Sequence, residues 1–470
     1  MKSFGLSLCA SFILMYGSPE SALAGQSSYL TVPVAKTEET FALQRTLVEA
    51  WTIVSEAFVD PSFNHLDWYD ELRRHLVNIS QTESSEKGAE QLKHMVAELG
   101  DPFTRWVPAS EYQEFRMTSD GEIKGGVGLL IASDPLSGNL VVLAPIKGSP
   151  AERAGIHPGD QVISVNGTDT SGLDGEEAAR ILRGEQGSSV EVEIARVSNQ
   201  FVPGQVNSGM SEDSRVEKKR FRMRRERVNL SPIFATAMHY DDHTYGYVRL
   251  VSFSQKAGNE MKRAVSQLKK EGAEAFILDL RNNPGGLVTS SLDIANVWLD
   301  GKSKHPVIFS ISGRPDDAGQ GASVQNVVLS GGNASTELPL VVLVNKQSAS
   351  ASEILAGALH DNGRALVIGE STFGKGKIQS VFELNDGSAL FVTVANYKTP
   401  NGTVIDKKGI SPDFACSLAP NSMDSRTIPD IPIAPGLIGA DSTILEELET
   451  DSCIKSAEVL LGKSQMKDQM

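Results

Sequence analysis

The sequence predicts a multidomain protein of the α+β class, in which a helical N-terminal region precedes a small β module and a layered α/β core. The chain has 470 residues, more than one ordinary hydrophobic core organises, so two or three domains are expected. The hydrophobic pattern also changes along the chain. It has a helical period before residue 119, short strands after it, and strands alternating with helices after residue 229.

The composition restricts the classes of function. Hydrophobic residues make up 40% of the chain and charged residues 22%, as in a soluble globular protein. The formal net charge is −15 at pH 7. An acidic chain lacks the basic footprint that nucleic acids require, so we expect no nucleic-acid partner and a well-solvated surface. Zinc-ligand spacings and His-Glu-x-x-His are absent from the sequence, so we expect no metal and no metal catalysis.

The N-terminus has the pattern of an export signal. Lys2 supplies a positive charge, and Leu6–Met15 is apolar but too short to span a bilayer. Ala22-Leu23-Ala24 has the small-x-small pattern of a cleavage site. We therefore predict a signal peptide over residues 1–24, with a buried N-terminal helix as the alternative.

Residues 25–118 form the expected helical region. Apolar residues between Phe41 and Phe58 recur mostly at steps of three and four, as on one face of a helix. Pro61 ends this helix. Further helical patterns run through Leu72 and Leu76 and from Glu90 to Leu99. Asp101-Pro102-Phe103-Thr104 then indicates a turn.

A β module is expected over residues 119–197. Val127–Ile131 and Leu140–Leu143 are strand-like runs bounded by turn-forming residues. Asn166-Gly167 is a strong tight-turn dipeptide, and a helix is expected over Glu176–Leu182. Residues 198–228 differ because they are polar and contain the basic run Lys218–Arg227. This pattern predicts a solvated insertion loop or a charged strand; an electrostatic docking patch is the alternative.

An α/β core is expected over residues 229–428, because strand and helix patterns alternate there. The expected strands are Tyr245–Leu250, Phe276–Leu280, Leu340–Val344 and Ala365–Ile368, and the expected helices are Gly258–Glu271 and Ala351–His360. Residues 429–470 are expected to form a proline-spaced linker, Pro429–Pro435, and a closing helix over Ser442–Leu461. Cys416 and Cys453 could form a disulfide in an exported chain, although their spacing does not require one.

Three segments of the core carry residues suited to nucleophilic catalysis: Leu280–Leu287, Ser348–Ile354 and Thr372–Gln379. A serine at a strand-to-helix junction lies beside helix N-terminal amides, which can bind an oxyanion. The Gly285-Gly286 pair can add a second donor without a side chain in the way. A lysine between two glycines can be enclosed by backbone, and burial would favour its neutral, basic form.

Each segment also has an ordinary interpretation. A Ser-Ala-Ser run often only begins a helix, and Asn-Pro-Gly-Gly alone is a turn. Gly369–Lys375 matches part of a phosphate-binding loop, but Gly376 occupies the position that requires Ser or Thr. A Ser-His-Asp hydrolase is disfavoured because no Gly-x-Ser-x-Gly elbow occurs, and His360 would lie nearly three helical turns from Ser350.

Taken together, the three segments resemble those of the C-terminal processing peptidases, or tail-specific proteases. The resemblance extends from Trp51 through Asp413. It includes the spacings of 25 residues from Ser350 to Lys375 and 4 from Lys375 to Gln379. It implies a core of the ClpP/crotonase-like type and peptide hydrolysis without a cofactor. By chemistry alone Ser348 and Ser352 are alternative nucleophiles; the resemblance selects Ser350.

The same resemblance assigns roles to individual residues. It implies Ser350 as the nucleophile, Lys375 as the general base and Gln379 as the residue that orients Lys375. Ala351 and the Gly285-Gly286 turn would supply the oxyanion amides, with the choice between the two glycines left open.

The β module resembles the PDZ domain that these peptidases carry. Its strongest part runs from Ser149 to Gly167. The resemblance implies that Gly126, Val127, Gly128 and Leu129 bind the substrate C-terminal carboxylate, and that the peptide adds as a strand beside the helix at Glu176–Leu182. The alternative for these glycines is a plain hairpin turn.

Within the family, the chain is most similar to the photosynthetic branch, which trims the photosystem II reaction-centre precursor in the thylakoid lumen. The similarity rests on Glu49-Ala50-Trp51, Phe58-Val59-Asp60, Ala295–Leu299 and Phe373–Ser380. It implies a serine endopeptidase of the thylakoid lumen acting on a protein with a free C-terminus, with peripheral membrane association through a membrane-protein substrate. The alternatives are a general periplasmic tail-specific protease and an inactive PDZ scaffold.

Overall fold

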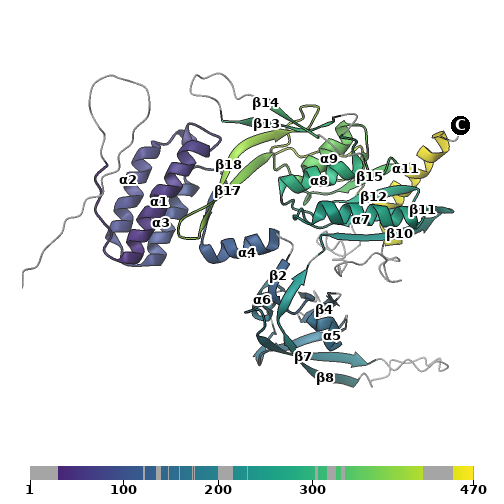
Figure 1. Cartoon of the computed structure of the whole chain (residues 1–470), viewed down its shortest axis with the longest axis horizontal. Helices are drawn as coiled ribbons and strands as arrows, with labels where there is room; N and C mark the ends of the chain where they lie inside the picture. Colours follow the sequence, from purple (N-terminus) through teal and green to yellow (C-terminus); the bar gives the residue numbers. More distant parts are fainter. Residues whose placement is uncertain are drawn as a thin grey trace, which may run out of the picture. The chain divides into compact units, whose positions relative to one another are not determined.

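Figure 1 shows the computed structural model of the chain. It describes residues 30–468 apart from 120–121, 134–138, 147, 158, 172, 174, 199–214, 230, 302–304, 315–323, 330–333 and 417–447. The expected signal peptide and proline-spaced linker lie outside the described residues. The chain divides into two compact units. Unit 1 draws on residues 1–115, 310–326 and 376–398, and unit 2 on residues 116–309, 327–375 and 399–470.

Unit 1 begins with helices around one hydrophobic core (Figure 1). They are α1 (Glu38–Ala57), the 3₁₀ turn η1 (Phe63–His65), α2 (Trp68–Gln81) and α3 (Ser85–Ala97). A further helix, α4 (Ala109–Ser119), contributes Tyr112 to a separate small cluster with Val107, Ala389 and Phe391. Side-chain oxygens of Thr37, Asp67 and Ser84 accept backbone N–H groups at the starts of α1, α2 and α3, as capping residues do. Leu47 and Leu92 are fully buried in this core, which confirms the helical interpretation of the region.

A sheet accompanies these helices. It has the order β1-β18-β13-β14, and β17 also pairs with β18. The strands are β1 (Arg105–Val107), β13 (Val307–Gly313), β14 (Val324–Val328), β17 (Lys377–Glu383) and β18 (Ala389–Lys398). β18 lies at the centre of the sheet, and its Leu390 and Val392 belong to the same core as the helices. The strands of this sheet, which come from three segments far apart in the sequence, were not among the expected strands.

The PDZ-like module of unit 2 is a sheet of order β3-β4-β5-β7-β8 with β6 on β5, and a separate ribbon β2-β9. Its elements are β2 (Glu122–Gly126), β3 (Leu129–Ser133), β4 (Leu140–Pro145), α5 (Pro150–Ala154), β5 (Gln161–Val165), β6 (Thr168–Asp169), α6 (Gly175–Leu182), β7 (Ser189–Ser198), β8 (Arg215–Arg224) and β9 (Glu226–Asn229). The basic run is therefore largely a strand. β8 pairs with β7 over its whole length, so the sheet continues past the expected boundary at residue 197.

The alternation of side chains explains why β8 joins this sheet. Met223 is buried in the module's core, and Phe221 packs against that core. Side chains of a strand point to opposite faces in turn, so the intervening Arg220 and Arg222 lie on the other face. Arg220 there pairs with Glu193 of β7. The basic run is thus largely a half-buried edge strand, which agrees with the charged-strand interpretation of the sequence.

The α/β core of unit 2 is a sheet of order β10-β11-β12-β15-β16-β19, parallel from β11 onward. Its strands are β10 (Ile233–Tyr240), β11 (His243–Leu250), β12 (Ala275–Asp279), β15 (Leu340–Val344), β16 (Leu366–Gly369) and β19 (Phe414–Ala415). Its helices are α7 (Ala257–Lys270), α8 (Val288–Trp298), α9 (Ala351–Asp361) and α11 (Ser452–Asp468). β12 and β15 are buried at every position, as central parallel strands are when both faces are covered.

The two faces of this sheet carry different helices. Phe276 of β12 packs edge-on against Trp298 of α8, with ring centroids 5.4 Å apart. Its neighbour Ile277 points to the other face, in a cluster that contains Ile454 and Leu461 of α11. The layered core is therefore confirmed. The closing helix α11 begins at Ser452. Residues 448–450 are helical as well, and residues 442–447 of the expected segment lie outside the described residues.

Candidate active site

Ser350 lies between β15 and α9, at the carboxyl edge of the parallel sheet. It is the N-cap residue of α9 and has φ 57° and ψ −115°. A positive φ is unfavourable for a residue with a side chain and is often found at functional positions. Ser350 is half-buried, whereas Ala349 and Ala351 on either side are buried. The junction thus keeps one serine open to solvent at the start of a helix.

The two neighbouring serines have structural roles. Ser348 Oγ donates to the carbonyl oxygen of Leu280 at 2.9 Å, and Ser352 Oγ donates to the carbonyl oxygen of Asn283 at 2.9 Å. Both serines are fully buried. Their hydroxyls attach the serine loop to the segment that follows β12, which makes them poor candidates for the nucleophile.

Glu353 connects the serine segment to the lysine segment. Its Oε2 accepts hydrogen bonds from the backbone N–H groups of Ser350 and Lys375, each at 2.9 Å. Its Oε1 accepts from the Thr372 hydroxyl at 2.6 Å and the Gly374 N–H at 2.7 Å. Glu353 is fully buried. One carboxylate therefore holds the backbone of both predicted catalytic residues.

The sequence reasoning did not identify Glu353, although a signal was present. A Ser followed three residues later by Glu is the capping-box pattern at a helix start, in which the Glu side chain binds the N-cap amide. Ser350 and Glu353 have this spacing. Lys375 itself is half-buried, and is thus less enclosed than its flanking glycines suggested; Gly374 and Gly376 are buried.

The Gly285-Gly286 turn packs directly against the serine loop. A Cβ atom on Gly285 would lie 2.9 Å from Ser350 Cβ and 2.7 Å from the Ala349 carbonyl oxygen, and φ here is +102°. Only glycine fits such a position without displacing the loop. The Gly285 N–H donates to Asn283 Oδ1 at 2.9 Å. Gly286 is exposed.

Two backbone amides near Ser350 remain available. Among the residues that the structure describes, neither the N–H of Gly286 nor that of Ala351 has a hydrogen-bond acceptor. The amide of Ala351 belongs to the first turn of α9, where N–H groups have no partner within the helix. Such amides are suited to binding an anion.

Gln379 lies on β17 in unit 1. Its Nε2 donates to the Lys377 carbonyl oxygen at 3.3 Å and to Thr393 Oγ1 at 3.5 Å. The Thr393 hydroxyl in turn donates to Asp101. Burial raises the pKa of Asp101, but hydrogen bonds from two threonine hydroxyls and the nearby Lys377 outweigh it and hold that pKa below its usual value. The role of Gln379 toward Lys375, a residue of unit 2, stays a prediction.

The predicted carboxylate-binding loop, Gly126 to Leu129, connects β2 to β3. Gly126, Val127 and Gly128 are buried and Leu129 is half-buried. β3 pairs with β4 and is an edge strand of its sheet as described, and α6 contacts β3. An edge strand beside a helix is the arrangement to which an extended peptide can add.

His360 is engaged away from Ser350, near the C-terminal end of α9. Its Nδ1 lies 2.8 Å from Asp361 Oδ1 and its Nε2 lies 3.1 Å from Asp413 Oδ1. The hydrogen bond to Asp361, together with the charge of Asp413, raises the pKa of this histidine despite its partial burial.

One group of side chains in unit 1 has the composition of a metal site. Glu71, His75 and Glu98 each offer a ligand atom, and these atoms lie within 4.8 Å of one another. However, Arg74 forms ion pairs with both carboxylates. Since the guanidinium already supplies the positive charge, we interpret this group as an ion-pair network.

Comparison with known proteins agrees with these features. Residues 244–416 match the family model described as "Peptidase family S41", and residues 141–196 match the model described as "PDZ domain". The class of protein is therefore a serine peptidase with a PDZ domain.

Proteins of similar sequence identify the family of serine peptidases to which the chain belongs. The chain is 42% identical over 461 residues to the carboxyl-terminal-processing peptidase 3, chloroplastic, of Arabidopsis thaliana, covering 96% of this chain and 82% of the relative. It is 39% identical over 388 residues to a carboxyl-terminal-processing protease of Synechocystis sp., covering 81% of each. A solved structure titled photosystem II D1 C-terminal processing protease is 34% identical, with 81% and 94% coverage and a TM-score of 0.49. The chain belongs to the carboxyl-terminal processing peptidases of family S41.

Within the described part of the chain, none of the helices has the length and apolar character needed to cross a membrane.

Proposed function

We propose that this peptidase hydrolyses peptide bonds near substrate C-termini, with Ser350 as nucleophile and Lys375 as general base. The observation that supports this assignment is the Glu353 carboxylate, which binds the backbone N–H groups of both residues. Two chain segments 25 residues apart are thereby held at one oxygen atom. The fully buried hydroxyls of Ser348 and Ser352 are committed to carbonyl oxygens, which favours Ser350 over its two neighbours.

In the first step, Ser350 Oγ attacks the carbonyl carbon of the substrate while the neutral amine of Lys375 accepts the hydroxyl proton. The carbonyl oxygen becomes negatively charged and is stabilised by the amides of Ala351 and Gly286. We choose Gly286 over Gly285 because the Gly285 amide already donates to Asn283. The Lys375 ammonium then protonates the departing amine, which leaves an acyl-enzyme on Ser350. In the second half of the reaction, neutral Lys375 accepts a proton from water as the water attacks the acyl-enzyme. Lys375 then returns the proton to Ser350 Oγ, and the acid product leaves.

The PDZ domain would select the substrate. Backbone amides in the Gly126–Leu129 loop would bind a terminal carboxylate, and the substrate chain would extend along the edge strand β3 beside α6. A free C-terminus is therefore part of the recognised structure.

For the natural substrate, we propose the precursor of the photosystem II D1 reaction-centre protein, cleaved in the thylakoid lumen. The relatives include chloroplastic and cyanobacterial processing peptidases, and one solved relative carries D1 processing in its title. The export signal expected at residues 1–24 fits this location. The enzyme would then approach the membrane through its substrate, a membrane protein.

The test is cleavage of a peptide that ends in the D1 precursor C-terminal sequence. The wild-type enzyme should release the extension, whereas Ser350→Ala should bind the peptide with unchanged affinity and not cleave it. Lys375→Arg should also be inactive, because arginine stays protonated and cannot accept a proton. Ser348→Ala serves as the matched serine control and should keep measurable activity.

Cleavage by Ser350→Ala would refute the nucleophile assignment. Equal cleavage of unrelated peptides with free C-termini would instead favour the general tail-specific protease. Binding of the peptide by the wild-type protein without any cleavage would favour the inactive scaffold.

A further inference from the structure

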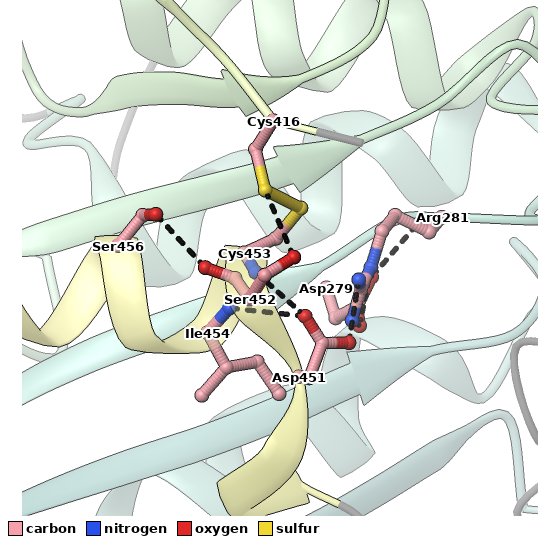
Figure 2. Close-up of a disulfide and its surroundings, with 8 residues drawn as sticks. All are labelled: Asp279, Arg281, Cys416, Asp451, Ser452, Cys453, Ile454 and Ser456. Carbon is pink, nitrogen blue, oxygen red and sulfur yellow. Dashed lines mark hydrogen bonds and ion pairs between the residues drawn. A yellow bond between two sulfur atoms is a disulfide. The ribbon is translucent and has the colours of Figure 1, made fainter. Parts of the chain in front are cut away.

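The C-terminal tail is joined covalently to the catalytic core, at the edge of the matched peptidase region. Cys416, directly after β19, forms a disulfide with Cys453 in the first turn of α11, 37 residues later (Figure 2). The family model ends at residue 416, so the disulfide connects its last residue to a helix outside it. Cys453 is fully buried, and Cys416 is half-buried.

Asp451, two residues before Cys453, uses its two carboxylate oxygens in different ways. Oδ1 accepts the backbone N–H groups of Cys453 at 2.8 Å and Ile454 at 3.2 Å, and so caps the N-terminus of α11. Oδ2 accepts a hydrogen bond from Arg281 Nη1 at 2.8 Å. Figure 2 shows Asp451 between the helix and Arg281. One side chain therefore both starts the tail helix and docks it to the core.

Arg281 belongs to a buried group of charges. Its guanidinium binds both carboxylate oxygens of Asp279, with Nη2 at 2.6 Å from Oδ2. Asp279 is also near the charge of Arg249 and accepts the hydroxyl of Tyr247. Asp279, Arg249 and Arg281 are all buried. Arg281 therefore pairs with two carboxylates, Asp279 within the core and Asp451 at the start of the tail helix.

The backbone of Arg281 leads directly into the oxyanion turn. Its N–H donates to Asp279 Oδ1 at 2.9 Å, which fixes the point where the chain leaves β12. Two residues later the carbonyl oxygen of Asn283 accepts the Ala349 N–H at 3.0 Å. Gly285 then packs against Ser350. Gly285 follows Arg281 by only four residues. A displacement of Arg281 would therefore also displace the Gly285-Gly286 turn.

We propose that Asp451 is a positioning residue for peptide hydrolysis, and that the Cys416–Cys453 disulfide holds it against Arg281. Asp451 acts through Arg281 on the turn that carries an oxyanion donor, and has no contact with substrate. This inference rests on the proposed function, because it requires the Gly285-Gly286 turn to serve the transition state. The core peptidase domain would then depend on a C-terminal tail that lies outside its family model.

The same arrangement makes the activity sensitive to reduction. A dithiol such as dithiothreitol attacks a disulfide sulfur and breaks the S–S bond. Each cysteine sulfur gains one electron and one proton to become a thiol, while the dithiol loses two of each and closes to its own disulfide. Once the disulfide is reduced, only non-covalent contacts hold the start of α11 against the core. The hydrogen bond between Asp451 and Arg281 is then formed in a smaller fraction of the molecules.

The test is the kinetics of Asp451→Asn on a cleavable peptide, with full-length protein. Asparagine keeps a side-chain oxygen that can cap α11 but removes the charge that balances Arg281. We expect kcat to fall about tenfold with KM unchanged, because the oxyanion donors stabilise the transition state more than the bound substrate. Glu271→Gln is the control: it removes one negative charge from an exposed position outside the tail and should leave both constants unchanged.

The second arm uses the wild-type enzyme. Reduction should lower kcat in the same way, reoxidation should restore it, and the Cys416→Ser/Cys453→Ser variant should be slow and indifferent to the reductant. If Asp451→Asn fails to fold, the reduction experiment by itself tests whether the attachment of the tail supports catalysis. Wild-type kcat in a folded Asp451→Asn enzyme would overturn the positioning role, and an unchanged kcat after full reduction would overturn the role of the disulfide. An active Ser350→Ala enzyme would overturn the proposed function itself, which separates the two failures.

Discussion

At the scale of single residues, the Glu353 side chain connects the serine segment to the lysine segment. It is buried in the first turn of α9 and accepts four hydrogen bonds from the serine and lysine segments. A carboxylate can accept all four because it has two oxygens and no hydrogen of its own when ionised. An amide of the same shape would present an NH₂ group to one pair of donors.

We therefore expect Glu353→Gln to lose activity by about 100-fold in kcat, because the backbone around Ser350 and Lys375 would shift by a fraction of an ångström to 1 Å. The measurement is steady-state kinetics together with circular dichroism. Glu370→Gln is the control, since Glu370 pairs with the exposed Lys346 at 3.4 Å. A Glu353→Gln enzyme with at least half of the wild-type kcat would show that this carboxylate is not needed to align the two residues.

At the scale of elements, helix α11 packs against the core through apolar side chains but also buries an acidic one. Its Ile454, Ala457 and Leu461 are buried against the β-sheet. Glu458 lies on the same helix and is also buried. Burial, reinforced by the negative charge of Glu449, raises the pKa of Glu458 to about 7.

The raised pKa makes the docking of α11 dependent on pH. The Glu458 carboxyl ionises near its ordinary value of 4.5 in the unfolded chain and near 7 in the folded protein. Between these two values the folded state holds the extra proton, so stability falls as the pH rises from about 4.5 to about 7 and stays low above it. The loss is at most about 3 kcal/mol at neutral pH and above.

We expect Glu458→Gln to protect the α11 amides from hydrogen exchange more than the wild type does at pH 8, with little difference at pH 5. Glutamine has the same shape and no charge to bury. Hydrogen exchange of α11 at the two pH values, corrected for the intrinsic rate, is the measurement. An equal effect of the substitution at both pH values would contradict the assignment of the raised pKa to this residue.

At the scale of the whole molecule, the protein combines a PDZ domain with a serine peptidase core. The loop Gly126–Leu129 belongs to the PDZ domain, and Ser350 to the α/β core. Gly128 has φ +75°, and a Cβ there would lie 2.3 Å from the Ser149 Cβ. The loop is therefore shaped by close packing that a side chain would disturb.

We expect amidation of the substrate C-terminus to lower kcat/KM by about ten- to 100-fold, because it removes a charge-assisted hydrogen bond worth about 1.5–3 kcal/mol. Gly128→Ala should lose this discrimination. Gly148→Ala is the matched control, with the same φ of +75° but nothing within 4 Å of the added Cβ, and it should retain it. Equal rates on free and amidated peptides with the wild-type enzyme would mean that the PDZ domain does not read the terminus.

The sequence by itself determined the order of the structural regions and the class of protein. The period of the apolar residues predicted the helices of unit 1 and the layered core, because burial of one face imposes that period locally. The resemblance to a known family carried by the Ser350 and Lys375 segments and the Gly285-Gly286 pair predicted a serine peptidase, which the comparisons confirm. These signals are local, since each lies within a few residues of a strand end or a helix start.

Only the tertiary structure decided which distant residues support that chemistry. Asp451 meets Arg281 across 170 residues, and Cys416 meets Cys453 across residues that carry no pairing signal. The basic run after residue 214 joined the PDZ sheet because β7 was available as a partner along its whole length. Buried charges and edge strands take their partners from whatever the fold brings near, and periodicity in the sequence does not record that proximity.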